Sequence, residues 1–246
     1  MRGSIQKQVI GGQEVTLYLP PKALRAKPCR LLLAGDGETL FELLTQLAGA
    51  LEERMAAEGQ GLILVGLHSD NRDADYTPWP AKGFDEDYPD FPGQAADYLR
   101  WIDSELLPGL RAAWPISDDP ADVGILGYSL SGLLATYAPY VSRSFGYVMS
   151  ISGSNWYEGL IPWLAEHDPL TDCRFYLSYG RAEGAGKYSM MKDAGECAEA
   201  AAAALRSRVG EDHVTLTSDN GRHTTKLVSR FTSALGWFQL RGHLPE

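Results

Sequence analysis

The chain has 246 residues, 44% of them hydrophobic and 22% charged, which is ordinary for a folded globular protein with a sizeable core. Its formal net charge of −10 disfavours nucleic acids and anionic membrane surfaces as partners, because both are polyanions. No apolar run approaches the ~18 residues of a membrane span, and the N-terminus lacks the apolar core of a secretory signal. Three widely spaced cysteines, Cys29, Cys173 and Cys197, fit reduced thiols, so we expect a cytoplasmic protein.

Predicted strands and helices alternate along the chain. Residues 9–19 indicate two short strands around a Gly-Gly turn, hence an antiparallel hairpin at a sheet edge. Apolar runs predict further strands at residues 30–34, 62–67, 123–126, 147–151, 174–179 and 213–217. Apolar spacing or composition predicts helices near residues 40–51, 99–107, 196–209 and 226–240, and a long loop rich in aromatics and proline occupies residues 69–91. This alternation predicts an α/β fold in one domain, residues 1–246, with a mostly parallel central sheet and helices on both faces.

The most informative stretch is Gly-Tyr-Ser-Leu-Ser-Gly at residues 127–132, directly behind the predicted strand 123–126. A serine at a sharp strand-to-helix turn needs very small neighbours, and this geometry presents its hydroxyl to a substrate. The pattern resembles the nucleophile elbow of α/β-hydrolases, with Ser129 as nucleophile. Ser131 replaces the second glycine of the G-x-S-x-G pattern, and serine is the next smallest residue that fits there. Small residues also occur where any parallel strand turns tightly into a helix, so the pentapeptide alone leaves both interpretations open.

Loops after the other predicted strands supply the partners that such a serine needs. Ligands of these sheets bind beyond the carboxyl ends of the strands. His223 follows the last predicted strand and is the expected general base, because an imidazole can accept the serine proton and return it to the leaving group. Glu183 follows the preceding strand and is the expected acid, with Asp193 and Asp219 as alternatives. The order Ser, acid, His is that of α/β-hydrolases.

An oxyanion hole is expected at two backbone positions. One donor is the amide of Leu130, directly after the serine, and the other comes from the turn at Gly37 and Glu38. The side chain of Asp36 is expected to form that turn rather than to take part in catalysis.

Several segments resemble the putative esterase family of α/β-hydrolases, which includes S-formylglutathione hydrolases, feruloyl esterases and enterochelin-type siderophore esterases. The segments are residues 31–37 (an apolar strand ending in Asp-Gly), 71–79 (an Arg…Asp-Tyr-Thr-Pro motif), 105–108 and 152–156. The resemblance covers nearly the whole chain. Departures are Ser131 for glycine, Gly153 for proline, and the Asn-Gly-Arg-His turn before His223.

This resemblance also implies which residues line the substrate pocket. Arg72 is expected to hold an anionic or catecholate group through its fork of donors, and Tyr76 and Trp156 to form an aromatic wall. Trp79 fits either such a wall or simple packing of the loop onto the sheet.

The sequence therefore predicts a serine esterase that hydrolyses small carboxylic esters through an acyl-enzyme, with a siderophore-type lactone or an aryl ester among the options. The alternatives are an acyltransferase on the same fold and a non-catalytic binding protein. No metal or cofactor is expected, since the acidic residues Asp85, Glu86, Asp87 and Asp90 fit a solvated loop better than a metal site. The expected partner is a small-molecule ester, and the expected state is a monomer or homodimer.

Overall fold

The computed structural model describes residues 1–83, 86–184 and 191–244, so Asp85 lies outside the described residues. Within these ranges eight strands form one sheet in the order β1-β2-β4-β3-β5-β6-β7-β8. The strands are β1 (Ser4–Ile10), β2 (Gln13–Leu19), β3 (Arg30–Ala34), β4 (Leu62–Leu67), β5 (Val123–Tyr128), β6 (Tyr147–Ile151), β7 (Arg174–Gly180) and β8 (Val214–Asp219). β2 pairs antiparallel with β1 and with β4, and all other neighbours pair parallel.

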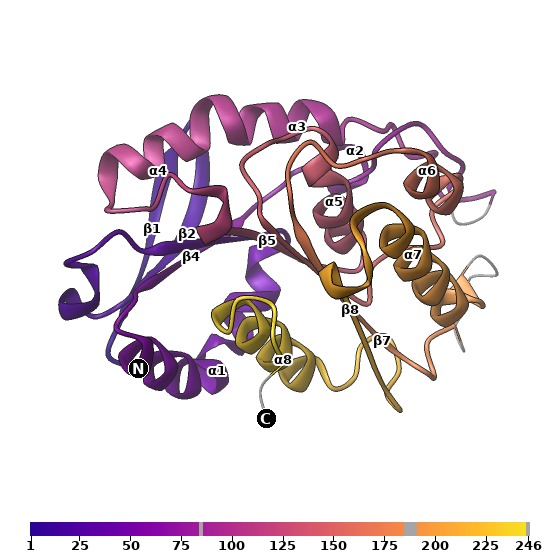
Figure 1. Ribbon diagram of the computed structural model, residues 1–246. Helices are drawn as coiled ribbons and strands as arrows, with labels where there is room; N and C mark the ends of the chain where they lie inside the picture. Colours follow the sequence, from indigo (N-terminus) through magenta and orange to yellow (C-terminus); the bar gives the residue numbers. More distant parts are fainter. Residues whose placement is uncertain (84–85, 185–190, 245–246) are drawn as a thin grey trace.

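Helices cover both faces of this sheet. On one face α1 (Gly37–Glu58) and α8 (Leu227–Gln239) lie side by side (Figure 1). The other face is covered by α3 (Ala95–Trp101), α4 (Leu107–Ala113), α5 (Leu130–Tyr137), α6 (Leu160–Glu166) and α7 (Ala194–Val209). This arrangement confirms the predicted α/β-hydrolase fold with a mostly parallel sheet.

The central strands consist mostly of apolar residues because both of their faces are covered, with buried Arg30 and Ser150 as polar exceptions. Every residue of β3 and of β4 is buried. Leu31 and Leu33 point into the core beneath α3 to α7, whereas Leu32 and Ala34 point into the core beneath α1 and α8. Strands buried on both sides form continuous apolar runs rather than alternating ones. The exact bounds of β3 and β4 could therefore be predicted from such runs.

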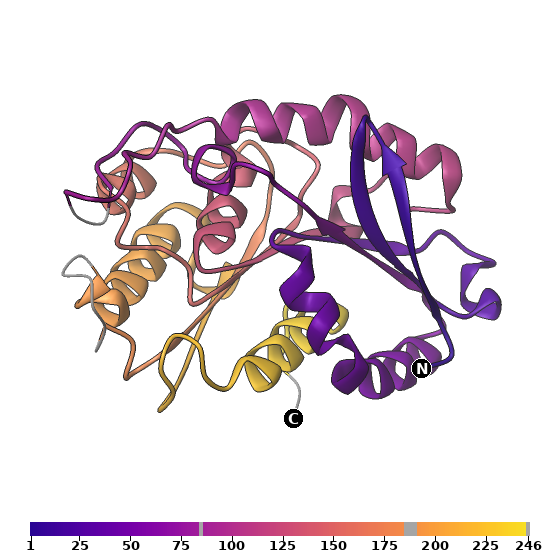
Figure 2. The same ribbon diagram turned by 180° about the vertical axis from the view of Figure 1, so that it is seen from behind.

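The predicted N-terminal hairpin is confirmed and lies at the sheet edge. Gly11 and Gly12 have φ of 58° and 80°, the left-handed conformations that a two-residue turn requires. The turn packs on the long helical segment that begins with α3 (Figure 2). Trp101 Nε1 donates to the Gly11 carbonyl at 2.9 Å.

Three helical features differ from the prediction. The helix predicted around residues 99–107 is longer, because α3 and α4 are joined by a π-helical stretch, Ile102–Leu106. α6 was not predicted, since its seven residues give little periodicity and include Pro162. The loop after β4 also contains a single helical turn, α2 (Arg72–Asp75). Among the described residues no helix is both long and apolar enough to cross a membrane.

Candidate active site

Ser129 lies between the end of β5 and the start of α5. Its backbone has φ of 60° and ψ of −120°, a region that residues other than glycine rarely adopt. The strained turn is tied to the neighbouring strand, because the Ser129 amide donates to the Ile151 carbonyl at 3.0 Å. The Ser154 amide in turn donates to the Ser129 carbonyl at 3.0 Å. The backbone conformation that the sequence predicted for the elbow is therefore present.

The small residues around the elbow have separate physical reasons. A Cβ on Gly127 would lie 2.0 Å from the Ser131 carbonyl oxygen, so only glycine fits there. The Ser131 hydroxyl donates to the Tyr128 carbonyl at 2.8 Å and accepts from the Tyr128 amide at 2.9 Å. Serine in place of the second glycine thus clamps the residue before the nucleophile. Gly132 packs against Gly153, where a Cβ would meet the Gly153 Cα at 2.9 Å.

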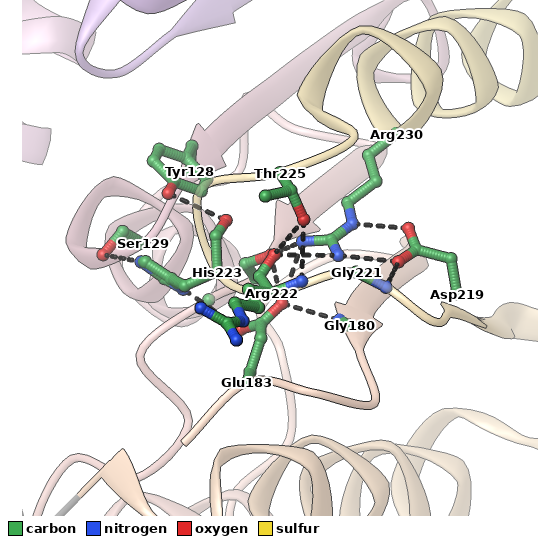
Figure 3. A network of polar contacts seen from close by, with 12 residues as sticks. Tyr128, Ser129, Gly180, Glu183, Asp219, Gly221, Arg222, His223, Thr225 and Arg230 are labelled. Carbon is green, nitrogen blue, oxygen red and sulfur yellow. Dashed lines mark hydrogen bonds and ion pairs between the residues drawn. The ribbon is translucent and has the colours of Figure 1, made fainter. Parts of the chain in front are cut away.

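Three predicted side chains from different loops meet at the end of the sheet (Figure 3). His223 Nε2 lies 3.0 Å from Ser129 Oγ, and His223 Nδ1 lies 3.0 Å from Glu183 Oε2. A carboxylate can only accept, so Nδ1 carries the proton and Nε2 is free to accept from the serine hydroxyl. The His223 side chain is 24% exposed, so it reaches the surface beside the serine.

The carboxyl group of Glu183 is held from several sides. Its side chain is only 3% exposed. Oε1 accepts from the Gly180 amide at 2.6 Å and from the Ser152 hydroxyl at 2.7 Å, which leaves Oε2 for the imidazole. Burial raises the pKa of Glu183, but the hydrogen bonds from His223, Gly180 and Ser152 outweigh burial and hold that pKa below its ordinary value. Glu183 is therefore an anion at neutral pH.

A buried arginine that the sequence reading missed lies behind this carboxylate. Arg230 of α8 is 3% exposed, and its Nη1 donates to Glu183 Oε1 at 2.9 Å. Its Nε and Nη2 donate to the two carboxylate oxygens of Asp219 at 2.8 and 2.9 Å (Figure 3). The signal was present in the sequence, because Arg230 shares the apolar face of its helix with Ala234 and Phe238.

The loop that carries His223 is also anchored by contacts other than those of the imidazole nitrogens. The Tyr128 hydroxyl donates to the His223 carbonyl at 3.0 Å, and the two rings stack with centroids 5.0 Å apart. On the other side of the loop, the Gly221 carbonyl accepts from the Ala182 amide at 3.1 Å. The Asn-Gly-Arg-His turn, which departs from the family pattern, is thereby held against the loop of Glu183.

The turn after β3 contains the predicted second oxyanion donor. Asp36 is left-handed, with φ of 48°, and its carboxylate forms a two-pronged ion pair with Arg72 at 3.1 and 2.7 Å. The Asp36 amide donates to the Tyr76 hydroxyl at 3.2 Å. Gly37 and Glu38 begin α1, and Leu130 begins α5. Amides in the first turn of a helix lack intrahelical acceptors, so all three positions meet a general requirement of an oxyanion donor. Their assignment stays a prediction.

The three predicted pocket residues occupy different environments. The Arg72 side chain is 44% exposed, but two of its donors are engaged by Asp36. Tyr76 is fully buried beneath this ion pair, so its ring supports the turn and offers no open face to a substrate. Trp156 is half-buried and follows the turn whose Ser154 bonds to the elbow. Trp79 packs among the rings of Tyr137, Tyr157 and Trp163.

The alternative acids lie elsewhere. Asp193 is an exposed residue at the start of α7, and Asp219 pairs with Arg230. His68, which directly follows β4, pairs with the exposed Glu38 and lies near Thr16. Among the described residues, no group of three or more His, Cys, Asp or Glu side chains is arranged to hold a metal ion.

Comparison with known proteins identifies the family of this chain. The model of the family described as "Putative esterase" matches residues 11–234. Uncharacterized protein YbbA of Bacillus subtilis (strain 168) is 30% identical over 246 residues, with 96% of each chain covered. An IroE-like serine hydrolase from Shewanella oneidensis has a TM-score of 0.75 at 17% identity, over 94% of this chain and 79% of that one. The siderophore hydrolase EstA from Aspergillus nidulans has a TM-score of 0.75 at 16% identity, over 98% and 95% of the chains.

The chain belongs to the putative esterase family of α/β-hydrolases. It is a carboxylic ester hydrolase, and a small-molecule ester is its class of substrate. At 16 and 17% identity the two solved structures share the fold with this chain.

Proposed function

We propose that the protein is a serine esterase whose nucleophile, base and acid are Ser129, His223 and Glu183. The observation that carries the proposal is the pair of 3.0 Å contacts that His223 makes with the other two. Rival acids are less well placed, since Asp219 pairs with Arg230 and Asp193 is exposed. The strained backbone of Ser129 supports the same assignment, because strain of this kind is characteristic of a nucleophile elbow.

The proposed reaction has two halves. Ser129 Oγ attacks the ester carbonyl carbon while His223 Nε2 takes the hydroxyl proton, and Glu183 stabilises the resulting imidazolium. The tetrahedral oxyanion accepts hydrogen bonds from the Leu130 amide and from the turn at Gly37 and Glu38. The imidazolium then gives its proton to the departing alkoxide, which leaves an acyl-enzyme. A water molecule, deprotonated by His223, attacks the acyl carbon. Collapse of the second oxyanion breaks the bond to Ser129 Oγ, which takes the proton back from His223, and the acid is released.

The substrate that we propose is a small ester of a hydroxylated aromatic or siderophore-type acid, including a lactone. The support is the fold shared with a protein named a siderophore hydrolase, together with the exposed guanidinium of Arg72 and the half-buried Trp156 on the loops around the elbow. A single-domain protein in the cytoplasm, as monomer or homodimer, remains our expectation. The free cysteines Cys29, Cys173 and Cys197 are consistent with that location.

An ester panel tests this function. Purified wild type and Ser129→Ala are compared on p-nitrophenyl acetate, on aryl esters of dihydroxybenzoate and on a catecholate trilactone. We expect wild type to hydrolyse all three classes, with the highest kcat/KM on a catecholate ester, and Ser129→Ala to hydrolyse none above background. Added alcohol acceptors distinguish hydrolysis from acyl transfer through the products formed. Equal rates for the two proteins would refute the serine mechanism.

Substitution of Arg72 distinguishes a role in holding the Asp36 turn from a role in binding the substrate. The ion pair to Asp36 holds the turn that carries Gly37 and Glu38, so we expect Arg72→Ala to lower kcat on p-nitrophenyl acetate by about 10-fold or more, approaching the ~10²-fold loss of one oxyanion donor. Arg100→Ala, which removes an exposed arginine paired with Asp97, is the matched control and should leave kcat unchanged. If Arg72→Ala raises KM for anionic esters alone and leaves acetate turnover intact, Arg72 binds substrate only.

A further inference from the structure

Arg230 is the one buried cation in contact with the acid of the proposed triad, within the part of the chain that the structure describes. Burying an arginine is costly unless its charge is compensated, and here two carboxylates compensate it. Glu183 lies on the loop after β7 and Asp219 is the last residue of β8, and all three guanidinium nitrogens are used between them. Burial would lower the pKa of Arg230, yet its contacts with Asp219 and Glu183 raise that pKa above its ordinary value, so the side chain stays charged.

We propose that Arg230 and Asp219 are a counter-charged pair of positioning residues that sets the pH at which the enzyme becomes active. They act through Glu183, which is the only member of the group that touches His223. This inference rests on the proposed triad and adds to it. Asp219 neutralises Arg230, so that the negative charge of Glu183 acts on the imidazole at nearly full strength. Arg230 in turn keeps Glu183 in place without cancelling its charge.

The net charge of Glu183, Asp219, Arg230 and the imidazole changes during the reaction. With a neutral imidazole, the two carboxylates and one guanidinium sum to −1, and the imidazolium formed during reaction brings the sum to zero. Removal of the Asp219 charge would leave Arg230 to oppose the imidazolium. Removal of the Arg230 charge would instead leave two carboxylates to stabilise it. The two neutralising substitutions should therefore shift the pH at which His223 becomes protonated in opposite directions.

The contacts of Arg230 also fix the position of the Glu183 carboxylate. Arg230 Nη1 donates to the Ser152 hydroxyl at 2.5 Å, and that hydroxyl donates to Glu183 Oε1 at 2.7 Å. With the Gly180 amide these donors saturate Oε1, and Oε2 remains for the imidazole. The close packing leaves no room for adjustment, since a Cβ on Gly180 would lie 2.3 Å from Arg230 Nη2.

Other charged or titratable groups near this cluster are weaker influences. Burial raises the pKa of Tyr128 to about 12, so the ring stacked on His223 is neutral at working pH. The groups that face the cluster from the surrounding elements are Tyr128 on β5, Tyr176 on β7, Arg72 on α2, Arg181 after β7, and Arg222 and Lys226 after β8. The four cations among them are exposed, and solvent and salt screen exposed charges. Arg230, by contrast, is buried and contacts both Asp219 and Glu183 directly.

The test is the pH dependence of kcat/KM on p-nitrophenyl acetate. Activity requires a neutral His223, so it falls on the acid side as the imidazole protonates. Asp219→Asn should move the midpoint of this acid limb to lower pH, and Arg230→Gln should move it to higher pH, each by about 0.5–1 pH unit. The double variant should return the midpoint to within about 0.3 unit of wild type, because one charge of each sign has been removed.

Further variants distinguish the effect of the Arg230 charge from the effect of its guanidinium geometry. Arg230→Lys keeps the charge but loses the fork, so we expect lower kcat with an unmoved midpoint. Arg208 and Asp168 form an exposed pair outside the site, and Arg208→Gln and Asp168→Asn should leave both midpoint and kcat unchanged. If Arg230→Gln does not fold, Asp219→Asn and Arg230→Lys still decide the question.

A readout without turnover keeps this test independent of the proposed mechanism. The His223 ring can be titrated by NMR in a Ser129→Ala background, with the same substitutions at Asp219 and Arg230. Opposite displacements in this titration support the charge pair even if Ser129→Ala were to retain esterase activity, which would refute the proposed nucleophile instead. Displacements in the same direction, or none, would overturn the charge pair.

Discussion

Ser129→Ala and His223→Ala should each lower kcat toward p-nitrophenyl acetate by about 10³-fold or more, the scale seen when a member of a catalytic triad is removed. The physical reason is that neither group can act alone. A serine hydroxyl is a weak nucleophile until a base takes its proton, and His223 Nε2 is 3.0 Å from it. KM should change little, because a small acetate ester makes few contacts with either side chain.

The double variant separates a catalytic pair from two independent contributions. Because Ser129 and His223 work as one unit, the double substitution should cost about as much as either single one. Glu183→Ala should cost less than His223→Ala, since the imidazole remains as a base and loses only its orienting partner. Losses that multiply in the double variant would show that the two residues act separately.

Gly127→Val should abolish most activity and lower Tm. Even the first atom of the new side chain would lie 2.0 Å from the Ser131 carbonyl oxygen, which is backbone and cannot move without deforming the elbow. Because Ser131 clamps Tyr128 next to the nucleophile, deformation would also misplace Ser129, and small misplacements can cost ~10²-fold in rate.

Gly49→Ala is the matched control for this glycine substitution. Gly49 is an exposed residue within α1, and a Cβ there would meet nothing within 4 Å. Alanine should therefore raise the free energy of unfolding by about 0.5–1 kcal/mol, from helix propensity alone. Thermal unfolding and acetate turnover of both variants provide the measurement. A folded, fully active Gly127→Val would contradict the tight elbow.

The sequence was most informative where local chemistry determines local structure. The bounds of β3, β4 and β6 follow from apolar runs, because strands covered on both faces carry few polar residues. The hairpin followed from Gly11-Gly12, since both positions require left-handed backbone. For the same reason Ser129 could be recognised, as its small neighbours are dictated by the turn itself.

Residues whose role depends on a distant partner could not be predicted. Asp36 and Arg72 are 36 positions apart and meet only because β3 and β4 are neighbours in the sheet. The sequence shows Arg230 as a charged residue on an apolar helix face. No nearby residue indicates that Glu183, 47 positions earlier, is its partner. Tyr76 was expected to line the pocket, yet its side chain is fully buried, which depends on packing that no local pattern records.

The most direct test of the central claim is to trap the acyl-enzyme. Wild type is mixed with p-nitrophenyl acetate, quenched in acid within the first turnovers, digested and analysed by mass spectrometry. The account predicts an acetyl group on the peptide that contains Ser129, absent in Ser129→Ala and strongly reduced in His223→Ala. Acetylation at another residue, or turnover that leaves Ser129 unmodified throughout, would contradict it.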